Sequence, residues 1–279
     1  MTDHRFLQCD VFSPTPTRGN GLAVVLDAEV LTDEQMQFFA RWTNLAETTF
    51  LLPPTVEGAD YKVRIFTPQR EMLFAGHPTL GSCAAWLHAG GQPNNSKIVR
   101  QECAIGVIDV DVSQPGEFAF KAPPTDIQPL SDEALTAICT ALEIPRQSVV
   151  NSAHLHNGPF WQALELESAE AVLAVDSSRV QWPAFSPIGL IGPHTVGSNA
   201  DFEVRMLAPS SNMSEDPITG SLNAALAHWL QAQGRAAHPL RVAQGTVIGR
   251  EGRVSIRPDA GAMWIGGQVH ILIDGRVRF

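Results

Sequence analysis

Short runs of β-branched and aromatic residues dominate the first part of the chain, and their pattern is typical of β-strands. These runs predict strands over Phe6–Phe12, Leu22–Leu26, Thr48–Leu52 and Lys62–Thr67. The first part of the chain is therefore expected to be dominated by β-structure.

A helical pattern interrupts these strands. Thr32 and Gln35 have the spacing of a capping box, in which each side chain accepts a hydrogen bond from the main-chain N–H of the other residue. Met36, Phe39 and Ala40 follow at the spacing of one helix face. We expect a short amphipathic helix here that packs over the early strands.

The second part of the chain repeats this mixture after a predicted linker. Pro123 and Pro124, followed by Pro129, predict the linker because consecutive prolines fit neither a sheet ladder nor a helix interior. We therefore predict an N-terminal lobe of residues 1–128 and a C-terminal lobe of residues 129–279, with the last strand free to cross back. Beyond the linker the pattern predicts a helix over Asp132–Leu142 and strands over Trp161–Leu166, Glu203–Ala208, Arg253–Arg257, Ala262–Ile265 and Val269–Ile273.

Composition favours a folded protein that acts on small molecules. The 279 residues are 44% hydrophobic and only 17% charged, which suffices for one large domain or two smaller ones and argues against disorder. A net charge of −10 argues against nucleic acid or an anionic membrane as a partner. The apolar stretch Leu22–Leu26 is far shorter than the roughly 20 residues of a membrane-spanning helix, and the N-terminus has no secretory pattern. We expect a cytoplasmic protein.

Neither the cysteines nor the histidines predict a metal site. The cysteines have unrelated spacings and no Cys-x-x-Cys pair, so buried thiols are expected at Cys9, Cys83, Cys103 and Cys139. His154 and His156 alternate as on one strand face, but a metal site needs a third ligand, and neither spacing nor neighbours supply one. No metal and no nucleotide cofactor is predicted, since no phosphate-binding glycine motif appears.

Two ordered sequence matches at half-length spacing indicate an internal repeat. Val63–Pro68 has a counterpart in Val204–Pro209, 141 positions later. His77–Ser82 aligns with Asp216–Ser221, 139 positions later, and an alanine-rich helix follows each segment. We infer two copies of a strand, loop and helix unit in two pseudo-symmetric lobes.

Each copy predicts a helix that begins at a proline, Pro78 or Pro217. Proline at the first helical position loses no needed N–H, and it pushes the preceding residue out of the helical region. Small residues at Gly76, Gly220 and Ser221 leave main-chain N–H groups approachable. Together with the helix dipole, such groups form an anion site that suits a carboxylate.

A purely structural interpretation of these helix starts is also open. Asp216 can serve only as an N-cap, and the glycines can serve only close packing. His77 stands at the position aligned with Asp216 but is a poorer cap. The difference in chemistry within a similar frame favours a functional role.

Several motifs, in this order, resemble the PhzF family. They are Gly19–Asn20 before Leu22–Val25, Glu47–Phe50, Phe66–Pro68, Gly76–Thr79, Glu215–Ser221, Gln244–Gly245 and Gly249–Arg250. The resemblance covers essentially the whole chain. It implies the diaminopimelate-epimerase-like α+β fold, in which two lobes each wrap a mixed sheet or barrel around a central helix, with the active site in the cleft between them.

The resemblance also implies an activity. The family's named member isomerises trans-2,3-dihydro-3-hydroxyanthranilate in phenazine biosynthesis without metal or organic cofactor. The expected function is therefore a cofactor-independent isomerase that moves a proton on a small carboxylated, cyclic or amino-acid-like metabolite, in a homodimer. The matching positions are Glu47, His77 and Asp216 for catalysis, and Gly76, Pro78, Thr79, Gly220 and Ser221 for substrate binding.

Glu47 has a chemical reason for the role that the resemblance implies. A carboxylate that carries a proton works best when partial burial lifts its pKa toward the operating pH. Leu45, Ala46 and Phe50 give Glu47 apolar neighbours in sequence. The alternative is a solvent-facing glutamate beside a strand, with no catalytic role.

Two other activities stay open. Related epimerases of this fold use paired cysteines at the helix starts, whereas Ala75 and Asp216 stand at the aligned positions here. Racemisation by two thiols is therefore disfavoured, but acid/base epimerisation by Glu47 and Asp216 is not. A non-catalytic ligand-binding or interaction protein of the same fold is the other alternative.

Overall fold

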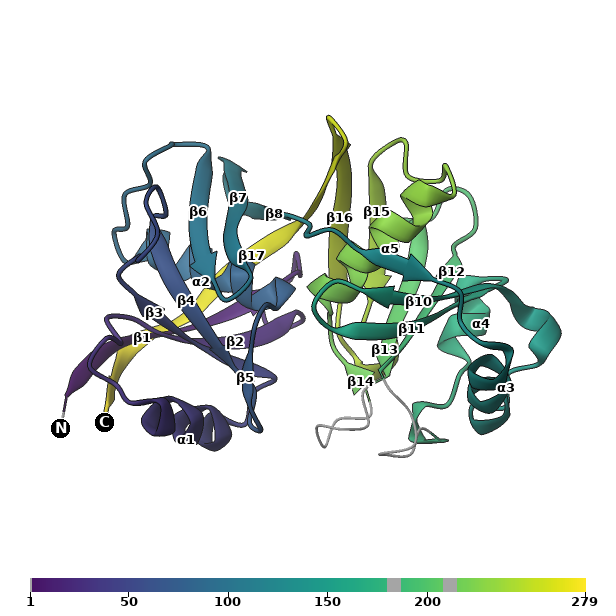
Figure 1. Ribbon diagram of the computed structural model, residues 1–279, viewed down its shortest axis with the longest axis horizontal. Coiled ribbons are helices and arrows are strands. Elements are labelled where there is room, and N and C mark those ends of the chain that lie inside the picture. The colour runs from purple at the N-terminus through teal and green to yellow at the C-terminus, as the bar shows by residue number, and fades with distance from the viewer. Residues whose placement is uncertain (1, 180–186, 208–214) are drawn as a thin grey trace. The chain divides into compact units, whose positions relative to one another are not determined.

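The computed structural model describes residues 2–179, 187–207 and 215–279. The chain divides into two compact units, one of residues 1–121 with 266–279 and one of residues 122–265 (Figure 1). The first unit ends before the boundary predicted at residue 128. Ala122, whose main-chain N–H donates to the carbonyl of Met263, already belongs to the second unit.

Strands of the first unit form a closed, mixed sheet. Its elements are β1 (Asp3–Val11), β2 (Asn20–Val25), α1 (Asp33–Thr43), β3 (Glu47–Leu52), β4 (Tyr61–Phe66), β5 (Glu71–Met72), α2 (Gly76–His88), β6 (Ile98–Cys103), β7 (Gly106–Gln114), β8 (Glu117–Lys121) and most of β17 (Ala262–Arg278). Neighbours pair in the order β8–β7–β6–β4–β3–β2–β1, and β17 pairs with both β1 and β8. The sheet thereby closes on itself.

Helix α2 is the central helix of this unit. It packs against β1, β2, β3, β6 and β8, and every residue from Gly76 to Ala85 is buried. A helix that is apolar on all sides belongs in such an interior. Gly81 allows the close approach, because a Cβ there would lie 2.5 Å from Cδ2 of Leu22 on β2.

The second unit repeats this arrangement. Its elements are β9 (Asp126–Gln128), α3 (Asp132–Ala141), β10 (Val149–His156), β11 (Phe160–Leu166), α4 (Ala169–Leu173), β12 (Ile188–Pro193), β13 (Phe202–Leu207), β14 (Glu215–Asp216), α5 (Gly220–Ala232), β15 (Leu240–Gln244), β16 (Gly252–Asp259) and the start of β17. Strands β10 to β16 pair with one another in the same order and directions as β1 to β7. Helix α5, buried from Gly220 to Ala227, corresponds to α2. The predicted α+β fold with two similar lobes around central helices is confirmed.

The structure corrects the predicted starts of the two central helices and the predicted alignment of the two copies. Helix α2 begins at Gly76, so Pro78 lies inside its first turn, and α5 begins only after Pro217. Ile65 on β4 and Met206 on β13 are equivalent positions of the two copies. Ile65 pairs with Met72, and Met206 pairs with Asp216, so Asp216 corresponds to Met72 rather than to His77. The matching Pro-x-x-Gly-Ser letters misled because the stretch between β4 and β5 is shorter than the one between β13 and β14.

Most of the predicted elements agree with the structure. The capping box of α1 is confirmed, since Thr32 N–H donates to Gln35 Oε1 at 2.9 Å and Gln35 N–H donates to Thr32 Oγ1 at 3.2 Å. The two strands predicted at the C-terminal end are instead one, β17, which runs from the sheet of one unit into that of the other. Ala208 and Pro209, the end of the second strand motif, lie outside the described residues.

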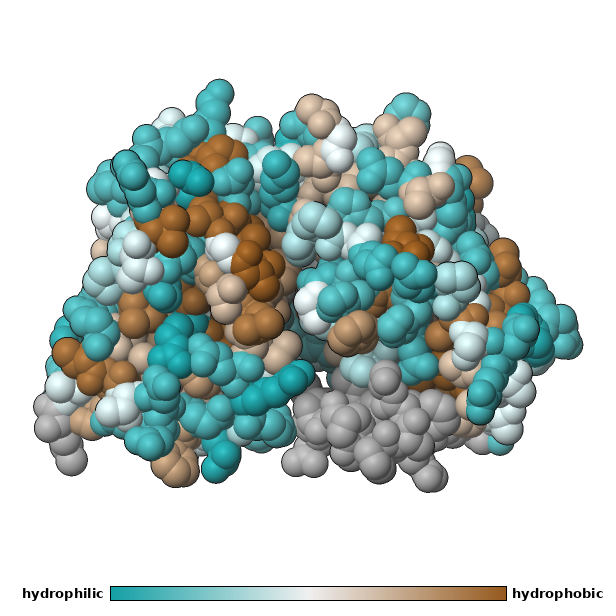
Figure 2. All heavy atoms as spheres, in the orientation of Figure 1, coloured by the Kyte–Doolittle hydropathy of each residue, from teal (hydrophilic) through white to brown (hydrophobic). Residues whose placement is uncertain are grey.

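The surface carries apolar side chains among polar ones. Figure 2 shows this mixture over both units on the face that it draws. Phe38 and Trp42 on α1 are exposed apolar residues of the first unit. Across the parts of the chain that the structure describes, no helix is long and apolar enough to span a membrane.

Candidate active site

Glu47 and His77 lie side by side in the first unit. Glu47 is the first residue of β3, and His77 lies in the first turn of α2, which packs on that strand. His77 Nε2 lies 3.3 Å from Glu47 Oε2, although the contact falls short of an aligned hydrogen bond. His77 is buried, whereas the side chain of Glu47 is 16% exposed. Glu47 Oε2, the oxygen that faces His77, is buried, so solvent or a ligand can meet only the remaining, exposed part of the Glu47 side chain.

Asn20 defines the chemical state of His77. Its amide Nδ2 lies 3.3 Å from His77 Nδ1, and an amide nitrogen can only donate, so Nδ1 accepts. A neutral imidazole with Nδ1 as acceptor carries its proton on Nε2, the atom that faces Glu47. Burial lowers the pKa of His77 to about 3. His77 therefore presents a neutral N–H, and not a cation, to the carboxylate.

The loop before β2 holds Asn20 in place. The main-chain N–H of Gly19 donates to Asp10 Oδ2 at 3.0 Å, and both Asp10 and Asn20 are buried. A Cβ at Gly19 would lie 2.3 Å from the carbonyl oxygen of Val11, so only glycine fits. Asn20 is a candidate residue that the sequence prediction missed, although the Gly19–Asn20 motif was a signal for it.

The other candidates of the first unit lie in the first turn of α2. Gly76, Pro78 and Thr79 are all buried there. The Thr79 hydroxyl donates to the Ala75 carbonyl at 2.9 Å and accepts from Gln101 Nε2 at 3.1 Å. Protein groups thus engage the Thr79 hydroxyl, and a role for these residues in substrate binding stays a prediction.

The second unit groups its candidates around the start of α5. Asp216 is buried on β14, and its Oδ2 accepts a short hydrogen bond from the Thr219 hydroxyl. Gly220 and Ser221 open the helix, and the Ser221 carbonyl accepts from Asn157 Nδ2 at 2.8 Å. By position in the helix, Ser221 is the counterpart of His77.

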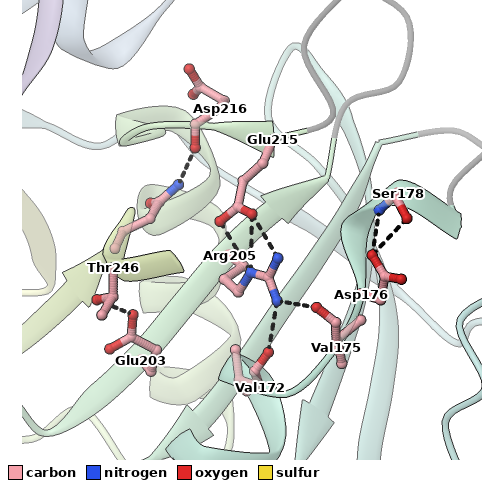
Figure 3. Close-up of polar contacts among 10 residues, drawn as sticks. Val172, Val175, Asp176, Ser178, Glu203, Arg205, Glu215, Asp216 and Thr246 are labelled. Carbon is pink, nitrogen blue, oxygen red and sulfur yellow. Dashed lines mark hydrogen bonds and ion pairs between the residues drawn. The ribbon is translucent and has the colours of Figure 1, made fainter. Parts of the chain in front are cut away.

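A buried ion pair lies directly beside Asp216. Arg205, which is fully buried, donates to both carboxylate oxygens of Glu215 at 2.7–3.2 Å, and to the carbonyls of Val172 and Val175 (Figure 3). Because Glu215 precedes Asp216 on the two-residue strand β14, the pair anchors that strand.

The carboxylate of Glu47 has no counterpart in the second unit. Thr48 pairs with Phe66 in the first unit, as Ile188 pairs with Leu207 in the second. The residue before Ile188 is Pro187, which therefore occupies the position of Glu47. Strand β3 belongs to the structural repeat, but its ionisable residue is particular to the first unit.

The two alternating histidines and the cysteines of the sequence analysis pack against other protein groups. His154 and His156 stack against Phe160 with ring centroids 5.5 and 4.0 Å away. Within the described residues, no three His, Cys, Asp or Glu side chains cluster as a metal site would require. The cysteines are free and buried, as predicted, and burial raises the pKa of Cys9 to about 12.

A comparison with known protein families shows where the chain belongs. The sequence model described as phenazine biosynthesis-like protein, PhzC-PhzF, matches residues 9–275. The chain belongs to the PhzF family. The motifs that carried the resemblance, from Gly19–Asn20 to Gly249–Arg250, lie within the matched range.

Individual relatives, one of which is named an isomerase, and a solved structure are similar to this PhzF-family chain over most of its length. It is 35% identical over 300 residues to antisense-enhancing sequence 1 of Schizosaccharomyces pombe, and the alignment covers 99% of each chain. It is 31% identical over 254 residues to trans-2,3-dihydro-3-hydroxyanthranilate isomerase of Pseudomonas fluorescens, covering 88% of this chain and 87% of that one. A PhzF-family structure from Bacillus anthracis matches the whole chain with a TM-score of 0.83 at 21% identity, which shows the shared fold.

Proposed function

We propose that this PhzF-family protein is an isomerase that moves a proton within a small carboxylated metabolite, cyclic or amino-acid-like, by acid/base catalysis without a cofactor. The observation that carries the proposal is the contact between the Glu47 carboxylate and the neutral imidazole of His77, at 3.3 Å. The isomerase names of relatives support the same reaction class.

Glu47 is the proposed proton carrier. Its carboxylate takes a proton from one carbon of the substrate, and the electron pair of the broken C–H bond shifts into the adjacent unsaturated system. The resulting carboxylic acid, whose proton exchanges with solvent because the Glu47 side chain is partly exposed, returns a proton to another carbon, so the reaction needs neither oxidant nor reductant. Because buried His77 stays neutral, it does not form the strong ion pair that would weaken Glu47 as a base.

The remaining candidates are proposed to bind the substrate. Gly76 and Gly220–Ser221 are the first residues of the two central helices, and their main-chain N–H groups suit a substrate carboxylate. Asp216, which is buried and charged when deprotonated, suits a hydrogen-bond donor of the substrate. Pro78 and Thr79 shape the first turn of α2. The homodimer and the cytoplasmic location stay predictions.

Deuterium exchange tests the proposal. The protein is incubated in D₂O with trans-2,3-dihydro-3-hydroxyanthranilate, and in parallel with a panel of small carboxylated metabolites, and NMR locates any deuterium gained. We expect label in at least one compound, and its loss by more than about a hundredfold in Glu47→Gln, as for removal of a general base. Glu34→Gln, which removes an exposed charge on α1, is the matched control and is expected to label at the wild-type rate.

The pattern of label separates the alternatives. Deuterium at a new carbon, with a moved double bond, indicates isomerisation, whereas deuterium at the original carbon with inverted configuration indicates epimerisation. Unchanged labelling in Glu47→Gln contradicts the role of Glu47. Binding of a panel member without any label favours the non-catalytic alternative.

A further inference from the structure

Gln244, at the end of β15, has a side chain that is completely buried and fully hydrogen-bonded. Its Oε1 accepts from the main-chain N–H of Thr219 at 3.1 Å and from Asn223 Nδ2 at 2.9 Å. Its Nε2 donates to the main-chain carbonyl of Asp216 at 3.3 Å and to Thr219 Oγ1 at 3.0 Å. One side chain therefore connects the strand that carries Asp216 with the first turn of α5.

Main-chain groups decide which way the Gln244 amide points. A main-chain N–H can only donate and a main-chain carbonyl can only accept, so Oε1 must face Thr219 N and Nε2 must face Asp216 O. The orientation of Asn223 is determined in the same way, because its Nδ2 also donates to the Thr219 carbonyl at 2.9 Å. Each of these hydrogen bonds therefore has a defined donor and a defined acceptor.

This assignment of donors and acceptors extends to the Asp216 carboxylate. Because Gln244 Nε2 donates to Thr219 Oγ1, the hydroxyl proton of Thr219 is left for its other partner, Asp216 Oδ2. That oxygen must then act as an acceptor, which a deprotonated carboxylate satisfies. Resting on the proposed function, we infer that Gln244 and Thr219 are positioning residues that hold Asp216 as a hydrogen-bond acceptor for an N–H or O–H donor of the substrate.

The inference narrows the substrate class. Asp216 binds a donor group, an ammonium or a hydroxyl, and Glu47 alone carries the proton. The substrate must then have a donor group in addition to its carboxylate. The network is also not optimised for stability alone, since the buried Oδ1 of Asn223 has no hydrogen-bond partner among the described residues. An unpaired buried acceptor is unfavourable for folding.

The test compares two threonines that each donate to a buried carboxylate. Thr219→Val removes the donor to Asp216 while it keeps the shape of the side chain, and Thr219→Ser restores the hydroxyl. Thr246, two residues after Gln244, donates to Glu203 Oε1 at 2.7 Å, so Thr246→Val is the matched control (Figure 3). The first readout is the ¹³C signal of the Asp216 carboxyl group at fixed pH, assigned with Asp216→Asn. The second readout is kcat and KM for trans-2,3-dihydro-3-hydroxyanthranilate.

We expect Thr219→Val to displace the Asp216 carboxyl signal and to raise KM about tenfold with a smaller change in kcat, as for a weakened charge-assisted hydrogen bond. Thr219→Ser should restore both values, and Thr246→Val should displace the Glu203 signal but not that of Asp216. An unmoved Asp216 signal, or a fall in kcat at constant KM, would overturn the inference. If Thr219→Val does not fold, Gln244→Met removes the amide that directs the Thr219 hydroxyl, and it should displace the Asp216 signal in the same way.

The two proposals fail in distinguishable ways. If the wild-type protein turns over no compound, the proposed isomerase is contradicted, but the carboxyl signal still reports whether Thr219 donates to Asp216. If turnover is normal and the signal does not respond to Thr219→Val, only the positioning role is contradicted.

Discussion

His77 lies 3.3 Å from the Glu47 carboxylate and yet is neutral at physiological pH, because burial lowers its pKa to about 3. A histidine beside a glutamate often forms an ion pair. Here Asn20 supplies a donor to His77 Nδ1, and the burial of the first turn of α2 excludes water from the ring. The pair therefore consists of a neutral imidazole beside a carboxyl group and not of two opposite charges. This difference from an ion pair has consequences for stability and for catalysis.

Neutral His77 makes the fold less stable in acid. In the unfolded chain the histidine pKa is about 6.5, so between pH 6.5 and pH 3 the unfolded chain binds a proton that the folded protein does not. Stability contributed by the low folded pKa is present above pH 6.5 and is lost as the pH falls through this window. From pH 7 to pH 5 the loss is about 2 kcal/mol. Urea unfolding should show this pH-dependent loss in wild type and in the exposed control His238→Gln, but not in His77→Gln. Equal pH dependence in all three proteins would contradict a neutral buried His77.

Asn20 should control the tautomer of His77. Asn20→Asp keeps the size of the side chain but replaces the donor at His77 Nδ1 by an acceptor, so the proton should move to Nδ1 or the ring should become doubly protonated. ¹⁵N NMR of the ring should show this change, and deuterium exchange should slow by roughly tenfold or more, since a buried hydrogen bond contributes about 1–2 kcal/mol. Asn44→Asp, at the left-handed C-cap of α1, is the control that leaves the ring unchanged. An unaltered His77 spectrum in Asn20→Asp would remove Asn20 from this role.

The two units offer a matched test of burial on an ion pair. Arg205 and Glu215 are fully buried, whereas Arg64 and Glu71, at the corresponding strand positions, are partly exposed. Arg205→Met should destabilise the protein by roughly 3–5 kcal/mol because it leaves a buried carboxylate without its cation. Arg64→Met should cost about 0–1 kcal/mol. Denaturant titration measures both changes in unfolding free energy, and similar losses for the two variants would contradict the role of burial.

Gly245 should tolerate substitution less well than Gly249. Both have left-handed φ angles, +86° and +72°, which Ala adopts at a cost of about 1 kcal/mol. A Cβ at Gly245 would also lie 2.7 Å from the Pro217 carbonyl oxygen, whereas nothing lies within 4 Å at Gly249. We expect Gly245→Ala to cost roughly 1–3 kcal/mol more than Gly249→Ala in unfolding free energy. It should also reduce turnover, because Pro217 follows Asp216. Equal effects of the two variants would show that the loop adjusts without loss.

Local patterns were sufficient for several features of the molecule. The capping box at Thr32 and Gln35 depends on neighbours four positions along the chain or fewer, so its residues alone predict it. The burial of the thiols and the existence of a repeat also follow from local composition and from order along the chain. The family motifs select Glu47 and His77 as candidates in the same way, because each motif is a contiguous segment.

By itself, the sequence thus determined the α+β class, the repeated unit, the family motifs and the ionisable candidates Glu47, His77 and Asp216. Only the tertiary structure decided that Asp216 corresponds to Met72, since strand pairing and not residue identity defines that position. It also decided that His77 is neutral and that Gln244 points its amide at Thr219. The physical reason is that charge state and hydrogen-bond direction depend on burial and on partners from distant strands, which no contiguous motif contains.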